Sequence, residues 1–243
     1  MTLLASWIGR DRALVAVDTR LTALDSTSAV GRLAARANVP GTLVEASKLL
    51  ALPHARLVLA HAGALSFLAS AFLRCQQLIG PGGFDELDEC MPDVLGCAFG
   101  QVLDMRRDLY PDVPIEEVRG QRLAVVGWSQ KGQRMRGALF NQDPRADGFQ
   151  RLPLAGFAEQ EDPRGRRFAA PWNAEKSGAL PYADTPEAME RLARLQMRDS
   201  PSAAEGKSGG RLLVAELTRD SVCVTSQCDL DSPRVGSEST VSA

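Results

Sequence analysis

Short blocks of apolar residues, separated by polar and turn residues, run along the whole chain and predict its strands and helices. Blocks of about five to six apolar residues bounded by turn residues are typical of buried strands, and six of them form three pairs with short turns between the partners. These predicted hairpins are Leu3–Ile8 with Ala13–Val17, Lys48–Leu52 with Arg56–Ala60, and Leu123–Trp128 with Arg134–Phe140. Two later strands are expected at Leu212–Leu217 and Ser221–Thr225.

Apolar residues that recur at helical spacing predict three helices. The first covers residues 64–79 and ends at the glycine-rich stretch 80–83. The second is expected from about Pro92, a favourable residue for a first helical turn, to Tyr110. The third begins after Thr185, which is a good N-cap, and extends to about Arg198.

The remaining segments lack a clear period and are expected to be irregular. Residues 24–44 are rich in small and polar residues and predict a loop, whereas 141–181 predict a long irregular insertion. We expect a single domain over residues 1–225 and a polar C-terminal tail over 226–243. The order of elements favours an α+β fold, with two packed antiparallel sheets and helices outside them.

Composition narrows the class of protein. The 243 residues are 44% hydrophobic, which is enough for one substantial core, and the net charge of -2 arises from interspersed acids and bases. The chain therefore offers no basic stripe for nucleic acid and no apolar run long enough to cross a membrane. The N-terminus does not resemble a secretory signal, and five cysteines at spacings unlike a zinc site suggest a reduced, cytoplasmic protein.

Spacing in the first two hairpins brings together residues whose side chains could take part in catalysis. A turn centred near Arg10 and Asp11 makes partner numbers sum to about 21, so that Thr2 lies beside Asp18. The face to which Asp18 points depends on the register and stays open at this stage. The second hairpin sets Lys48 across from Ala60 and His61.

The turn after the second hairpin is a candidate for binding an anion. His61, Ala62 and Gly63 lead from the strand into the first predicted helix. Backbone N–H groups at such a turn lack intrahelical acceptors and can stabilise an oxyanion. Two hairpins could thus present a threonine, a carboxylate, a lysine and a set of amide donors.

The order of these motifs resembles that of a known family. The run TLLASWIGRDRALVAVDTRLT, residues 2–22, is similar to the start of mature proteasome β subunits and bacterial HslV, including its Asp18-Thr19-Arg20-Leu21-Thr22 element. Ser47-Lys48 and the stretch 58–63 resemble the family's lysine strand and the turn that follows it. Ser208-Gly209-Gly210 resembles its late Ser-Gly-Gly element, and the chain is thereby interpreted as a bacterial proteasome homologue.

This resemblance implies a fold and a set of roles. The fold would be the four-layer αββα sandwich of N-terminal nucleophile hydrolases. Thr2 would be the nucleophile once Met1 is removed, with no propeptide, and Asp18 and Lys48 would complete the catalytic group. Supporting residues would be Arg20, Ser208 and a late acid that stays open between Asp199 and Glu205, with oxyanion donors from the backbone of His61, Ala62 and Gly63.

The function implied is a threonine-type endopeptidase that cleaves peptides or unfolded proteins inside a homo-oligomeric ring. It would need no metal or organic cofactor, and an ATP-driven unfoldase is a further candidate partner. Two alternatives remain open: an inactive ring or scaffold subunit of the same fold, and a small-molecule amidase of the same superfamily.

Overall fold

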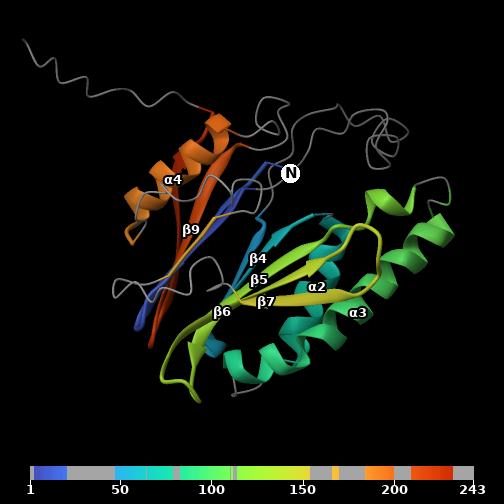
Figure 1. Ribbon diagram of the computed structural model, residues 1–243, viewed down its shortest axis with the longest axis horizontal. Helices are drawn as coiled ribbons and strands as arrows, with labels where there is room; N and C mark the ends of the chain where they lie inside the picture. Colours follow the sequence, from blue (N-terminus) through green and yellow to red (C-terminus); the bar gives the residue numbers. More distant parts are fainter. Residues whose placement is uncertain are drawn as a thin grey trace, which may run out of the picture.

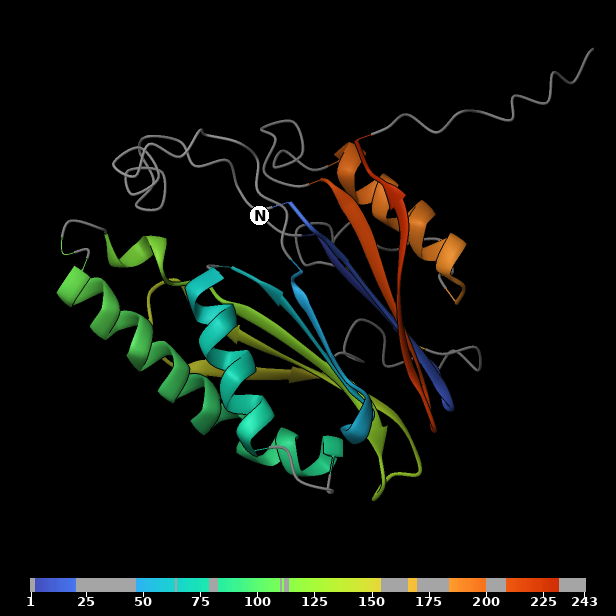
Figure 2. The ribbon, with the colours of Figure 1, turned by 180° about the vertical axis from the view of Figure 1, so that it is seen from behind.

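Two antiparallel sheets pack face to face and are flanked by helices on both outer sides (Figures 1 and 2). This computed structural model describes residues 3–20, 47–63, 65–78, 83–109, 111, 114–153, 166–169, 184–199 and 209–231. Helices α2 and α3 cover one sheet and α4 covers the other, so the layers run helix, sheet, sheet, helix. The predicted α+β sandwich of four layers is confirmed.

The first sheet carries both ends of the described chain. Its strand order is β10-β9-β2-β1-β8, and every pair is antiparallel. The strands are β1 (Leu4–Ile8), β2 (Arg12–Asp18), β8 (Arg166–Ala169), β9 (Arg211–Thr218) and β10 (Val222–Asp229). Leu4 pairs with Val17 and Ile8 with Ala13, so the partner numbers sum to 21 as predicted.

The second sheet follows the chain without crossovers, in the order β3-β4-β5-β6-β7. Its strands are β3 (Leu49–Leu52), β4 (Leu57–Ala62), β5 (Arg122–Ser129), β6 (Arg134–Gln142) and β7 (Phe149–Pro153), with short 3-10 turns at Pro53–Ala55 and Ile115–Glu117. Leu49 pairs with Ala60, and the His61 N–H donates to the Lys48 carbonyl at 2.9 Å. The predicted pairing of Lys48 with the end of β4 is confirmed.

Alternation of side chains along the strands divides the apolar residues into three cores. Val15, Val17, Val58 and Ala60 lie between the sheets, while Leu57 and Leu59 face α2 and α3. Leu14 and Ala16, with other residues of the first sheet, pack against α4. Because both faces of each sheet are covered, the central strands are apolar throughout, as their sequence indicated.

The helices are α2 (Leu65–Leu78), α3 (Gly83–Leu109) and α4 (Pro186–Asp199). Thr185 caps α4 as predicted, since its Oγ1 accepts a hydrogen bond from Ala188 N at 3.2 Å. None of the helices among the described residues is long and apolar enough to span a membrane.

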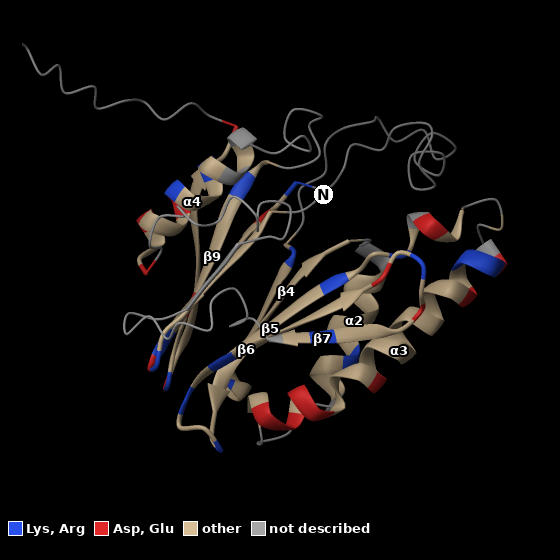
Figure 3. Cartoon of the chain, viewed as in Figure 1, with Lys and Arg blue, Asp and Glu red and all other residues tan. Residues whose placement is uncertain are grey.

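The predicted start of α3 at Pro92 was wrong, because the helix begins at Gly83 and contains Pro92. Acidic residues Asp85 and Glu86 occupy the first turn, where negative charge favours a helix (Figure 3). Asp85 also accepts hydrogen bonds from Ser129 Oγ at 2.7 Å and Lys131 N at 2.9 Å. These contacts attach the first turn to the β5–β6 hairpin.

Two irregular segments predicted from sequence contain regular structure. The insertion expected over 141–181 includes the end of β6, all of β7 beside it, and β8, which pairs with β1. The tail expected from Ser226 onward is wrong for its first residues, because β10 continues to Asp229 and Leu230 is buried. The loop predicted at 24–44 lies outside the described residues.

Candidate active site

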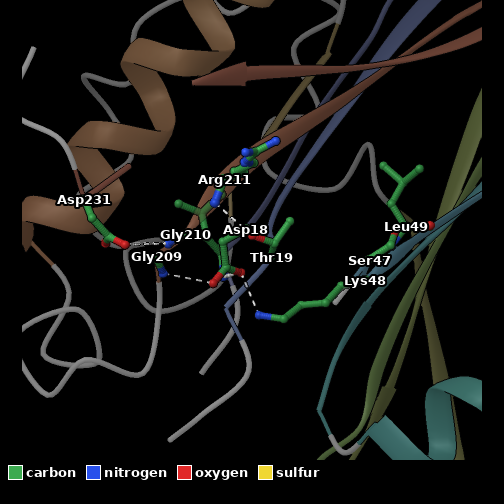
Figure 4. A network of polar contacts seen from close by, with 10 residues as sticks. Asp18, Thr19, Ser47, Lys48, Leu49, Gly209, Gly210, Arg211 and Asp231 are labelled. Atoms are coloured by element: carbon green, nitrogen blue, oxygen red, sulfur yellow. Dashed lines mark hydrogen bonds and ion pairs between the residues drawn. The ribbon is translucent and has the colours of Figure 1, made fainter. Parts of the chain in front are cut away.

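A buried ion pair joins the two sheets at one end of the sandwich. Asp18 ends β2, Lys48 precedes β3, and the Lys48 Nζ lies 3.0 Å from Asp18 Oδ1 (Figure 4). Their side chains are 0% and 5% exposed, respectively. Asp18 therefore points toward the lysine, which answers the question of orientation that the sequence left open.

Asp18 also contacts two backbone segments that are far apart in sequence. The Leu3 N–H donates to Asp18 Oδ1 at 2.9 Å, and the Gly209 N–H donates to Oδ2 at 3.1 Å. With Lys48, three N–H donors surround one carboxylate, which is the environment that stabilises its ionised form. The start of the first strand, the lysine segment and the late glycine pair thus converge on Asp18.

Burial is the largest influence on the ionisation of the pair. It raises the pKa of Asp18 and lowers the pKa of Lys48, because both charges are removed from water. The ion pair opposes both shifts, and the nearby positive charge of Arg20 further lowers the pKa of Lys48. Lys48 is thus fixed in position by its ion pair with Asp18, and it releases its proton more readily than an exposed lysine does.

A second polar cluster supports the Gly209 segment. Arg20 forms an ion pair with Asp231, whose Oδ2 also accepts a hydrogen bond from Gly210 N at 3.1 Å. Gly209 has φ +141°, and a Cβ there would lie 2.5 Å from Asp231 Oδ1 and 2.8 Å from Arg20 Nη1. Glycine is therefore required at this position, and Asp231 and Arg20 hold the backbone that donates to Asp18.

Replacement of Asp231 with alanine is expected to lower the free energy of unfolding by about 1 kcal/mol, because a partly exposed ion pair and one hydrogen bond are lost. Chemical denaturation followed by circular dichroism measures this change. Asp220→Ala, at an exposed position in the β9–β10 turn, is the matched control and should change stability by less. Equal effects of the two substitutions would contradict a supporting role for Asp231.

The predicted oxyanion donors are not equivalent. The His61 N–H is occupied by the Lys48 carbonyl, so that part of the prediction was wrong. Successive residues of an antiparallel strand direct their N–H groups to opposite neighbours, so Ala62, which pairs with Arg122, directs its N–H toward β5. Continued one residue beyond the strand, the same alternation would place the Gly63 N–H on the Lys48 side, so Gly63, with φ +147°, remains the candidate donor.

Several predicted site residues lie outside the described part of the chain. These are Thr2, Glu205 and Ser208, although their neighbours Leu3 and Gly209 both contact Asp18. Asp199 is the last residue of α4, and its side chain is likewise outside the description. The choice between Asp199 and Glu205 as the late acid therefore stays as the sequence left it.

Two residues near the site were missed by sequence reasoning. Asp231 was assigned to the tail, although the apolar Leu230 beside it indicated a segment that packs. Gln121 lies one residue before β5 and hydrogen-bonds with His61 at 3.0 Å between Oε1 and Nε2. A single glutamine before an apolar run carries no sequence signal that would have identified it.

Solved structures with a similar fold were found among proteins named Anbu. An Anbu protein from Hyphomicrobium sp. strain MC1 matches with TM-score 0.55 and 13% identity, over 95% of this chain and 87% of that one. Its Gly-1 mutant matches with TM-score 0.54 and 14% identity, over the same shares. Anbu (ancestral beta-subunit) from Yersinia bercovieri matches with TM-score 0.55 and 14% identity, over 94% and 88%.

At this level of identity the likeness shows the fold alone, a four-layer sandwich of two antiparallel sheets between helices. No protein-family model matches the sequence, and no curated protein is significantly similar to it. The sequence interpretation as a proteasome β-subunit or HslV-type threonine peptidase was wrong in its choice of relatives. The matching structures are Anbu proteins, which are proteasome-like but distinct from that group.

Proposed function

We propose that this chain is an N-terminal-threonine amidohydrolase whose nucleophile is Thr2, exposed by removal of Met1. The observation that supports it is the Leu3 N–H bonded to Asp18 Oδ1 at 2.9 Å, the same oxygen that Lys48 Nζ contacts at 3.0 Å. Because Thr2 is covalently joined to Leu3 N, this contact favours an N-terminal residue within reach of the lysine.

The α-amine of such a threonine serves as its own base. Its reference pKa is about 7.7–8.0, so a large fraction is neutral near pH 8. A positive charge on Lys48 disfavours protonation of the amine and lowers its pKa further. Asp18 orients Lys48 and keeps it charged. The Gly209 N–H holds Asp18 in place, and Arg20 supports the Gly209 segment through Asp231.

The reaction then follows from these groups. Thr2 Oγ attacks an amide carbonyl carbon while its proton passes to the α-amine, and the carbonyl oxygen becomes an oxyanion. The Gly63 N–H stabilises that oxyanion, a contact whose loss typically reduces the rate by about 10²–10³-fold. The leaving amine takes the proton from the α-ammonium, and water releases the acyl group from Thr2.

We further propose that the substrate is a peptide bond and that the chain works as a subunit of a homo-oligomeric ring in the cytoplasm. The name of one structural neighbour, ancestral beta-subunit, supports a subunit role. An unfoldase that supplies extended chains would be a consistent partner for such a ring.

Mass spectrometry of the intact protein tests the nucleophile directly. The protein is produced with a removable N-terminal fusion whose cleavage leaves Thr2 first, and is then exposed to a β-lactone. One adduct mapped to Thr2 is expected, with none on Thr2→Ala of similar melting temperature and none on protein that retains Met1. Absence of an adduct on wild-type protein would contradict the proposal and favour an inactive ring or scaffold subunit.

The oligomeric state distinguishes a ring-forming peptidase from a small-molecule amidase. A ring-sized particle in sedimentation analysis is expected for a peptidase that encloses its sites. A reactive protein that sediments as a monomer or dimer would contradict the ring and favour a small-molecule amidase.

A further inference from the structure

A buried polar pair, His61 and Gln121, packs against the turn at Gly63 that follows β4, and the proposed chemistry does not use its side chains. His61 and Gln121 are each 1% exposed, and His61 Nε2 is 3.0 Å from Gln121 Oε1. The Gln121 Nε2 donates to the Val118 carbonyl at 2.7 Å, so its Oε1 is the atom left to accept from histidine. His61 therefore carries a proton on Nε2 and donates it to Gln121 Oε1.

Both members of the pair are anchored from several sides. The His61 N–H donates to the Lys48 carbonyl at 2.9 Å, and its ring lies 5.5 Å from that of Phe67 in α2. The Gln121 carbonyl accepts from Gln142 N at 2.9 Å, which fixes it to the end of β6. A buried, hydrogen-bonded polar pair specifies one geometry more sharply than apolar residues do.

The pair fills the space where a side chain of residue 63 would lie. A Cβ on Gly63 would meet Gln121 Oε1 at 2.1 Å and His61 Nε2 at 3.1 Å. With φ +147°, the backbone at Gly63 also adopts a conformation that glycine tolerates and other residues rarely do. The turn thus rests directly on the two side chains, and their positions determine where its backbone runs.

We propose that His61 and Gln121 are positioning residues that hold the Gly63 amide toward the carbonyl attacked beside Lys48. This inference rests on the proposed function, because it assigns the pair to the oxyanion site of that reaction. His61 also links this site to Lys48, since its backbone N–H donates to the Lys48 carbonyl. Misplacement of a reacting or stabilising group by about 1 Å can reduce a rate by about 10²-fold.

Two reagents that react with Thr2 by different routes test the inference. β-Butyrolactone acylates Thr2 through a carbonyl oxyanion, whereas methyl vinyl sulfone adds to Thr2 without forming one. The variant His61→Phe keeps a ring against Phe67 and removes the N–H donor to Gln121. We expect its lactone rate, followed as the adduct mapped to Thr2, to fall at least about 10-fold, while the vinyl sulfone rate stays within about two-fold of wild type.

Further variants make the result specific to the pair. Gln121→Leu removes the acceptor from the other side and should give the same selective loss, so the test does not depend on one variant folding. His61→Gln restores an N–H donor and should recover part of the lactone rate. His54→Phe, at the only other histidine and in an exposed position, should change neither rate.

The outcomes distinguish this inference from the function on which it rests. A wild-type protein that forms no lactone adduct on Thr2 overturns the proposed function and this inference with it. A wild type that reacts, with variants whose two rates are both unchanged or fall equally, overturns the positioning role alone. Selective loss of the lactone reaction in both His61→Phe and Gln121→Leu supports it.

Discussion

Replacement of Lys48 with methionine is expected to lower the free energy of unfolding by about 3–5 kcal/mol and to abolish acylation of Thr2. The cause of the instability is Asp18, which is 0% exposed and would keep a buried charge without its cation. Its remaining donors, the N–H groups of Leu3 and Gly209, do not neutralise that charge. Chemical denaturation and intact mass after treatment with a β-lactone measure the two effects.

A double variant separates stability from reactivity. Asp18→Asn with Lys48→Met removes both charges, so it should regain much of the stability lost by Lys48→Met alone and yet stay unreactive. Lys131→Met is the matched control, because its ion pair with Glu89 is 70% exposed on both sides and, screened by solvent, should contribute little to stability. Acylation by Lys48→Met at the wild-type rate would contradict the role given to the lysine.

The strands around this site could be predicted because local sequence determines them. Each of the first three hairpins has a short turn between two apolar blocks, and such a turn fixes the register of the strands beside it. The register of the second hairpin places Lys48 beside the end of β4. The register of the first hairpin places Leu3 beside Asp18. The convergence of the two hairpins on one carboxylate required the packing of the sheets.

Other elements depend on contacts that are distant in sequence. Pro92 was interpreted as a helix start, but apolar residues continue at helical spacing on both sides of it and pack against the second sheet. That packing outweighs the local cost of an internal proline, which is about 3 kcal/mol. Similarly, β7 is short and partly polar, and it is held by Phe149 against Phe67 and by Arg151 against Asp88.

Residues that support the site were missed for the same reason. Asp231 and Gln121 have no periodic or motif signal, and each acts on a segment remote in sequence. Asp231 lies 211 positions from Arg20, and Gln121 lies 60 positions from His61. Sequence reasoning therefore found the residues of the two hairpins, with Arg20 and the Gly209 segment, and could not find the partners that Asp231 and Gln121 supply.

Acidification from pH 6.5 to 4 is expected to remove about 3 kcal/mol of stability through His61 alone. Burial lowers the pKa of His61 to about 4; the hydrogen bond with Gln121 opposes this shift, and the charge of Lys48 adds to it. In the unfolded chain the pKa of histidine is about 6.5, so between these values the unfolded state binds the proton and the folded state does not. Stability is therefore complete above about pH 6.5 and decreases as the pH falls toward 4, at about 1.4 kcal/mol per pH unit.

The difference between wild type and His61→Gln isolates this contribution. Carboxylates and the Asp18–Lys48 pair titrate in both proteins, so their effects cancel when the free energies of unfolding are subtracted at each pH. The difference should move in favour of His61→Gln as the pH falls from 6.5 to 4, and then level off once His61 is protonated in the folded state as well. His54→Gln, at an exposed position, is the control for replacing a histidine with glutamine. A pH-independent difference would mean that His61 has the same pKa in the folded and unfolded protein, and burial would then not disfavour its protonated form.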